Sequence, residues 1–74
     1  MSSIRAQLGH NIQRLRRSQD LSIERLASMT GKPVSTLRGI EQGKKRLSVD
    51  ALACICRHLN TTPNDLYGWT EENA

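Results

Sequence analysis

The sequence predicts an all-α domain of five short helices, and three observations lead to that fold class. Apolar residues recur at helical spacing near both ends of the chain. Ser and Thr residues stand where helix N-caps are needed, and a Gly and a Pro interrupt the middle. With 74 residues, the chain has room for one domain with a small core, which we expect to span 1–70, followed by a frayed tail at 71–74.

The first helix is expected over about residues 3–18. Its apolar stripe, spaced by four, four and three, consists of Ile4, Leu8, Ile12 and Leu15. Ser2 or Ser3 is positioned to cap its start. Gly9 lies inside this helix, where glycine costs about 1 kcal/mol relative to alanine.

Two shorter helices joined by a tight turn are expected between residues 21 and 43. Ser22 suits the N-cap of the second helix, and Gly31 suits the position after its end because glycine tolerates positive φ. Pro33 suits the first position of the third helix, about 33–42, and Gly43 suits its termination. The segment therefore has the form of a helix-turn-helix unit.

The fourth helix is expected to begin at the N-cap Ser48 and to end at Asn60. Its apolar face follows the i, i+3, i+4, i+7 pattern and consists of Leu52, Ile55, Cys56 and Leu59. A short fifth helix follows a Thr61 or Thr62 cap, with Pro63 at its first position.

Charge is distributed unevenly along the chain. Residues up to Arg46 carry ten cations and three carboxylates, a net of +7, whereas residues from Leu47 onward carry one cation and four carboxylates, a net of −3. A cationic first part fits a face that binds a polyanion. The aromatic residues are one Tyr and one Trp with no Phe, which argues against a stacking platform for single-stranded nucleic acid.

Other classes of protein and site receive little support. No apolar run approaches the roughly 20 residues of a membrane span, and we expect a cytoplasmic protein with reduced thiols. Cys54 and His58 are four residues apart, a spacing that suits two metal ligands, but no further Cys or His lies close in sequence. We therefore predict no metal, no cofactor and no small-molecule ligand. His10 and His58 have no evident nucleophile partner, so we do not expect an enzyme.

The middle of the chain resembles the helix-turn-helix of the phage repressor and Cro family. The residues that carry the resemblance are Leu21, Ser22, Glu24, Leu26 and Ala27, then Gly31, Ser35–Leu37, Ile40, Glu41, Gly43 and Lys44. It extends from about Leu8 to about Leu66 and implies a compact five-helix, lambda-repressor-like DNA-binding domain. One departure is Ile23, because many relatives carry a phosphate-binding Gln at this place.

The resemblance implies that the third helix is the recognition helix, whose N-terminal residues meet base edges. The outer side of that helix gives four expected base contacts, Val34, Ser35, Arg38 and Gly39. Of these, Arg38 is able to grip a guanine bidentately, although a phosphate contact or a salt bridge is an alternative for it. Expected phosphate contacts are Thr36, Gln42, Lys44, Lys45 and Arg46.

The resemblance also implies an ion pair between Arg16 and Glu41 that ties the first helix to the third. It further suggests a homodimer whose interface contains Leu66, Tyr67 and Trp69, although Trp69 packing on its own monomer is the alternative.

We therefore expect a sequence-specific transcription regulator of double-stranded DNA that acts as a dimer on an inverted-repeat operator. It would be of the repressor or restriction–modification controller type. The alternative hypothesis is a helix-turn-helix fold used as a protein–protein interaction module or antitoxin-like partner. Ile23 and the weak base readers Val34 and Gly39 motivate this alternative.

Overall fold

The computed structural model describes residues 3–68, and all regular structure in this range is helical. The helices are α1 (Ile4–Ser18), α2 (Ile23–Thr30), α3 (Val34–Glu41), α4 (Val49–Leu59) and α5 (Pro63–Tyr67). The predicted number and order of helices are therefore confirmed. Trp69 and the expected tail at 71–74 lie outside the described residues.

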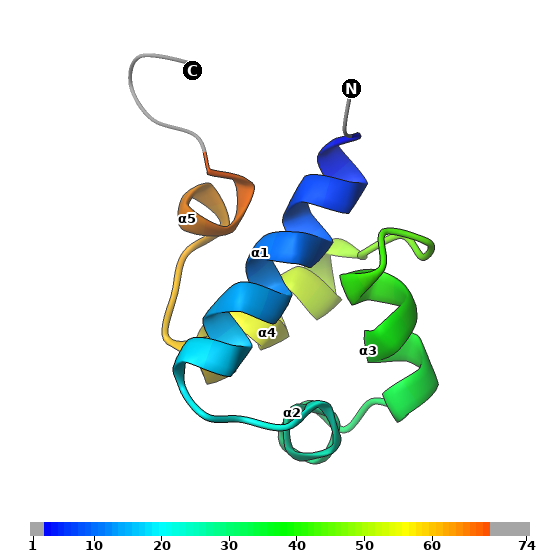
Figure 1. Cartoon of the computed structure of the whole chain (residues 1–74), viewed down its shortest axis with the longest axis vertical. Helices are drawn as coiled ribbons and strands as arrows, with labels where there is room; N and C mark the ends of the chain where they lie inside the picture. The colour runs from blue at the N-terminus through cyan, green and yellow to red at the C-terminus, as the bar shows by residue number, and fades with distance from the viewer. Residues whose placement is uncertain (1–2, 69–74) are drawn as a thin grey trace.

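Helix α1 runs through the middle of the molecule and contacts both α3 and α5 (Figure 1). Helix α2 contacts α3 and α4, and α4 contacts α5. In Figure 1, α2 is seen almost end-on while α3 runs along the page, so the axes of these two helices are strongly inclined to one another.

The N-caps of four helices are residues that the sequence predicted as caps. The side chains of Ser3, Ser22, Ser48 and Thr62 each accept a hydrogen bond from a backbone N–H in the first turn of the helix that follows. One boundary differs from the expectation: Pro33 is the N-cap of α3, with an extended ψ of 147°, and the helix itself begins at Val34.

The core lies where the five helices meet and holds the predicted apolar residues of α1 and α4. Its fully buried large side chains are Ile12, Leu26, Leu37, Ile55, Leu59 and Leu66. Ile4 departs from the prediction: it belongs to the apolar stripe of α1 by spacing, but it is 59% exposed. It stands at the first turn of α1, beyond the end of the core.

Candidate nucleic-acid interface

The turn between α2 and α3 is fixed by backbone geometry. Gly31 ends α2 in the left-handed region at φ 69°, where a side chain is strained. The next N–H, of Lys32, donates to the carbonyl of Ala27 at 3.1 Å, which closes the helix end. Pro33 then forms the N-cap of α3, with its ring fixing φ at −63°. These residues therefore set the direction in which α3 leaves the turn.

The two sides of α3 differ in chemistry. Leu37 and Ile40 are buried and hold the helix on the core, while Ser35 and Arg38 are exposed. Val34 was expected on the outer side, but it is half-buried and packs against the core, so only part of it is available to a ligand. Thr36 is also half-buried.

Gly39 was expected to expose its Cα on the same outer side. Instead, the aliphatic chain of Lys45 covers it: a Cβ built on Gly39 would lie 2.9 Å from Lys45 Cγ. The exposed part of the α3 surface is therefore formed by Ser35, Arg38 and this lysine.

The segment after α3 carries the expected phosphate contacts. Gly43 adopts φ 74° just after the C-cap Gln42, which turns the chain away from the helix axis. The side chains of Gln42, Lys44, Lys45 and Arg46 are all exposed. The N–H groups of Lys44 and Lys45 both donate to the carbonyl of Gly39, at 2.9 and 3.2 Å, so the cationic loop is held against the end of α3.

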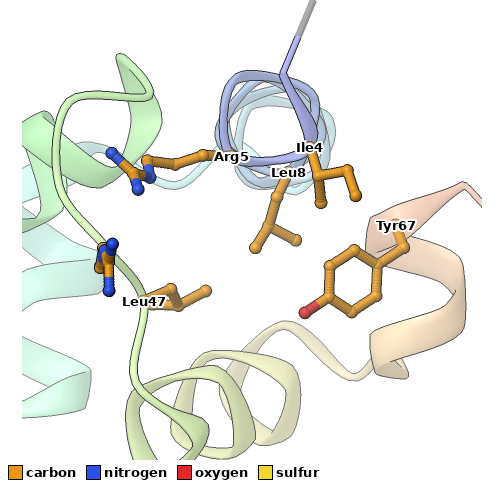
Figure 2. Close-up of a pocket in the computed structure, with 6 residues that line it drawn as sticks. Ile4, Arg5, Leu8, Leu47 and Tyr67 are labelled. Carbon is orange, nitrogen blue, oxygen red and sulfur yellow. The ribbon is translucent and has the colours of Figure 1, made fainter.

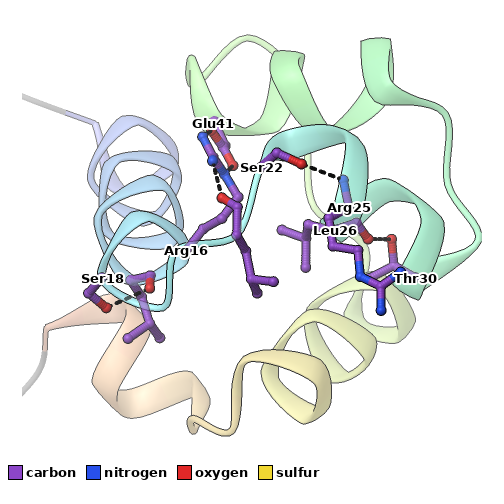
Figure 3. A network of polar contacts seen from close by, with 9 residues as sticks. Arg16, Ser18, Ser22, Arg25, Leu26, Thr30 and Glu41 are labelled. Atoms are coloured by element: carbon purple, nitrogen blue, oxygen red, sulfur yellow. Dashed lines mark hydrogen bonds and ion pairs between the residues drawn. The ribbon is translucent and has the colours of Figure 1, made fainter.

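The structure places Arg16 of α1 against Glu41 of α3. Arg16 Nε donates to Glu41 Oε2 at 2.8 Å, and Nη2 donates to Oε1 at 3.0 Å (Figure 3). The third nitrogen, Nη1, donates to the carbonyl of Leu21 at 2.7 Å, in the loop before α2. The hydrogen bond that Arg16 donates to the Glu41 carboxylate raises the pKa of the guanidinium, so Arg16 stays charged. One side chain therefore joins α1, the loop before α2 and the end of α3.

Gly9 provides a second link between α1 and α3, which could not be predicted from the sequence, where Gly9 is only an unfavourable helix residue. A Cβ built on Gly9 would lie 2.2 Å from the carbonyl oxygen of Ile40 and 2.7 Å from that of Glu41. The backbone of α1 thus touches the last turn of α3 directly, which only glycine allows.

Three amide side chains of the first helix and its cap also have roles that the sequence analysis missed. Asn11 Nδ2 donates to the carbonyl of Leu66 at 2.7 Å, and Gln7 Nε2 donates to that of Tyr67 at 3.1 Å. Gln19 Nε2 donates to the carbonyl of Leu59 at 2.8 Å. These bonds satisfy carbonyls at the ends of α4 and α5, which have no partner within their own helices. No local sequence pattern distinguishes such donors from surface amides.

Of the three residues expected at a dimer interface, the structure describes Leu66 and Tyr67. Leu66, expected at the interface, is 1% exposed and packs in the core of its own chain, so its side chain does not reach the surface. Trp69 lies outside the described residues. Tyr67 is half-buried and lines a groove of about 200 Å³ between α1, α5 and the loop before α4 (Figure 2). The other lining residues are Ile4, Arg5, Leu8, Arg46 and Leu47.

Cys54 and His58, one helical turn apart on α4, lie side by side, with Cys54 Sγ 3.7 Å from His58 Nδ1. The Cys54 thiol donates weakly to the carbonyl of Thr30 at 3.9 Å, and His58 Nδ1 lies 2.8 Å from the carbonyl oxygen of Cys54. Among residues 3–68, no group of three or more His, Cys, Asp or Glu side chains is arranged to hold a metal ion. None of the described helices is both long and apolar enough to cross a membrane.

Comparison with known proteins agrees with this geometry. The family model of the Cro/C1-type HTH DNA-binding domain matches residues 11–72, which is most of the chain. The chain belongs to the Cro/C1-type helix-turn-helix family. Membership of the Cro/C1-type family assigns it DNA binding and no enzymatic activity. Helices α2 and α3, with the tight turn between them, form the helix-turn-helix of this fold.

Solved structures of other regulators share this Cro/C1-type fold. The restriction–modification controller protein C.AhdI from Aeromonas hydrophila is 28% identical, with a TM-score of 0.79 over 82% of this chain and 92% of that one. The clp gene regulator ClgR from C. glutamicum is 24% identical, with a TM-score of 0.86 over 89% of this chain and 85% of that one. At that identity, the likeness to ClgR shows the fold alone. A search of curated protein sequences gave no match.

Proposed function

We propose that this protein is a sequence-specific transcription regulator that binds duplex DNA as a dimer, with α3 in the major groove. The observation that carries the proposal is the exposed face of α3 next to the cationic loop that follows it. Ser35 and Arg38 are exposed on the helix, and Lys44, Lys45 and Arg46 are exposed within five residues of its end. A helix with base-reading side chains beside a row of cations suits a groove bordered by phosphates.

The roles divide by the chemistry of each side chain. Arg38 has the fork of donors that fits guanine O6 and N7, and the Ser35 hydroxyl bonds several base edges with weak discrimination. Thr36, Gln42, Lys44 and Arg46 are proposed to bind phosphates, which fix the orientation of the protein without reading sequence. Since Ile23 packs against the core, a phosphate contact at the start of α2 would come from backbone N–H groups.

The link from Arg16 to Glu41 supports this function because it fixes α3 relative to α1 and α2. A recognition helix reads bases only if its orientation in the groove is reproducible. Buried, bidentate contacts are geometrically more restrictive than single hydrogen bonds. We propose that the Arg16–Glu41 ion pair holds α3 in this orientation in the free protein.

The proposed mode of action is occupancy of an operator by two copies related by a two-fold axis, in the cytoplasm where the DNA lies. The recognition helices of such a dimer lie about one helical turn apart, roughly 34 Å. We place the dimer contact at the groove beside Tyr67, because Ile4 at its edge is 59% exposed. C.AhdI is named as a restriction–modification controller protein, and this likeness supports control of a restriction–modification operon as one role of this regulator.

The experiment that tests the proposal is selection of binding sites from a random duplex pool at two salt concentrations, followed by sequencing. We expect enrichment of an inverted repeat whose half-sites are centred about ten base pairs apart. Salt-sensitive retention without enrichment would contradict sequence specificity. No retention at low salt would overturn DNA binding at this face and favour a protein-interaction module.

A further inference from the structure

The side chain of Lys45 lies along the outer face of α3 at Gly39. A Cβ built on Gly39 would lie 2.9, 3.0 and 3.4 Å from Cγ, Cδ and Cε of Lys45. These three carbons therefore occupy the place that a side chain at position 39 would take. The backbone of the loop supports this arrangement, since the N–H of Lys45 donates to the carbonyl of Gly39 at 3.2 Å.

Position 39 follows Ser35 by four residues, and residues four apart are neighbours on one side of a helix. Gly39 itself has no side chain to present on that side. Because the aliphatic chain of Lys45 runs over Gly39, its ammonium group leaves the protein from the same side of α3 as Ser35. An ammonium group offers three donors and no acceptor, which suits the O6 and N7 acceptors of guanine in the major groove.

We infer that Lys45 determines sequence specificity by reading a guanine from the place that Gly39 leaves open. This inference rests on the proposed function, and it replaces the phosphate contact expected for Lys45 from the sequence. Gly39 acts as a positioning residue: it contacts no base and makes room for the lysine. Lys44 is exposed and adjacent, but the three atoms nearest to a Gly39 Cβ all belong to Lys45, so we keep Lys44 as a proposed phosphate-binding cation.

The test repeats the site selection with wild type, Lys45→Ala and the matched control Lys44→Ala. Wild type should prefer G·C over the other pairs at one position of each half-site, by about 5- to 150-fold. Lys45→Ala should lose this preference and keep the preferences at other positions. Lys44→Ala should keep every preference, weaken binding to all sequences alike, and reduce the slope of log affinity against log salt by about 1.

Gly39→Ala provides an independent test, because it leaves the charge of Lys45 in place. The added methyl would meet Lys45 Cγ and displace the side chain, so the same G·C preference should be weakened. If this variant acts through Lys45, adding it to Lys45→Ala should change the preference no further. Circular dichroism of each variant, matching wild type, confirms that the fold is retained.

Two results would overturn the inference, and they differ from failure of the proposed function. Unchanged preferences in Lys45→Ala, with a uniform loss of affinity and a smaller salt slope, would make Lys45 a phosphate contact. A different specificity in the double variant than in Lys45→Ala would remove the positioning role of Gly39. If the wild type itself enriches no sequence, the proposed function fails first.

Discussion

Arg16 and Glu41 form a bidentate ion pair between α1 and α3, with side chains 9% and 3% exposed. We predict that Glu41→Leu destabilises the fold by about 3–5 kcal/mol, because it leaves a buried guanidinium without its carboxylate. Urea unfolding would measure this loss. The double variant Arg16→Met with Glu41→Leu should recover most of it, since a buried pair replaced by apolar residues is often neutral. Equal destabilisation by the single and double variants would show that the energy does not lie in the pair.

Gly9→Ala should destabilise the protein although alanine is the better helix former by about 1 kcal/mol. Its methyl would lie 2.2 Å from the Ile40 carbonyl oxygen, so α1 and α3 must separate. Overpacking of this kind costs about 1–3 kcal/mol. The control is His10→Ala, the exposed neighbour on the same helix, which should change the free energy of unfolding by less than about 0.5 kcal/mol. A Gly9→Ala variant as stable as wild type would rule out the close approach.

Arg38→Ala tests the exposed face of α3 directly. If Arg38 reads a guanine, the variant should lose about 1–3 kcal/mol of discrimination at one base position and little elsewhere. The measurement is affinity for a set of operators that differ at single base pairs. Equal weakening on every sequence, with a smaller salt dependence, would instead assign Arg38 to a phosphate.

Ile4→Ser should weaken the proposed dimer without unfolding the monomer, because Ile4 is 59% exposed at the edge of the groove. Sedimentation equilibrium over a range of concentrations would show a higher dissociation constant than for wild type. The matched control is Val49→Ser, which removes another exposed apolar side chain that does not line the groove. A wild-type protein that stays monomeric at high concentration would contradict self-association without DNA.

Cys56 gives the stability a dependence on pH. Burial, with a smaller contribution from the charge of Asp65, raises the pKa of the Cys56 thiol in the folded state. Because this pKa is higher in the folded state, the neutral Cys56 thiol contributes its full stabilisation of the fold below the pKa of an unfolded thiol, about 8.5. This contribution is lost as the pH rises through the pKa of the thiol in the folded state. Urea unfolding between pH 7 and 10 should therefore show a steeper loss for wild type than for Cys56→Ala. Parallel pH profiles would contradict this prediction.

The sequence by itself determined where the helices lie. Caps at Ser22, Ser48 and Thr62 and terminators at Gly31 and Gly43 act through neighbouring backbone groups, so their signals are local. Helical periodicity marks the inward faces for a similar reason, because it depends only on spacing along one helix. The Arg16–Glu41 contact was anticipated through family resemblance, since nothing in the spacing of two distant charges requires them to meet.

Only the tertiary structure decided which outward or terminal residues are available to a ligand. Leu66 is buried in the core of its own chain, and Ile4 is exposed outside it. Val34 is half-buried, with one side packed against the core and the other exposed to solvent. The close approach at Gly9 and the placement of Lys45 over Gly39 depend on how one helix or loop packs against another. Such contacts join residues that are far apart or lie in different elements, and their geometry follows from packing of the whole domain. Local propensity therefore fixes the helices, whereas packing fixes the surface proposed to meet DNA.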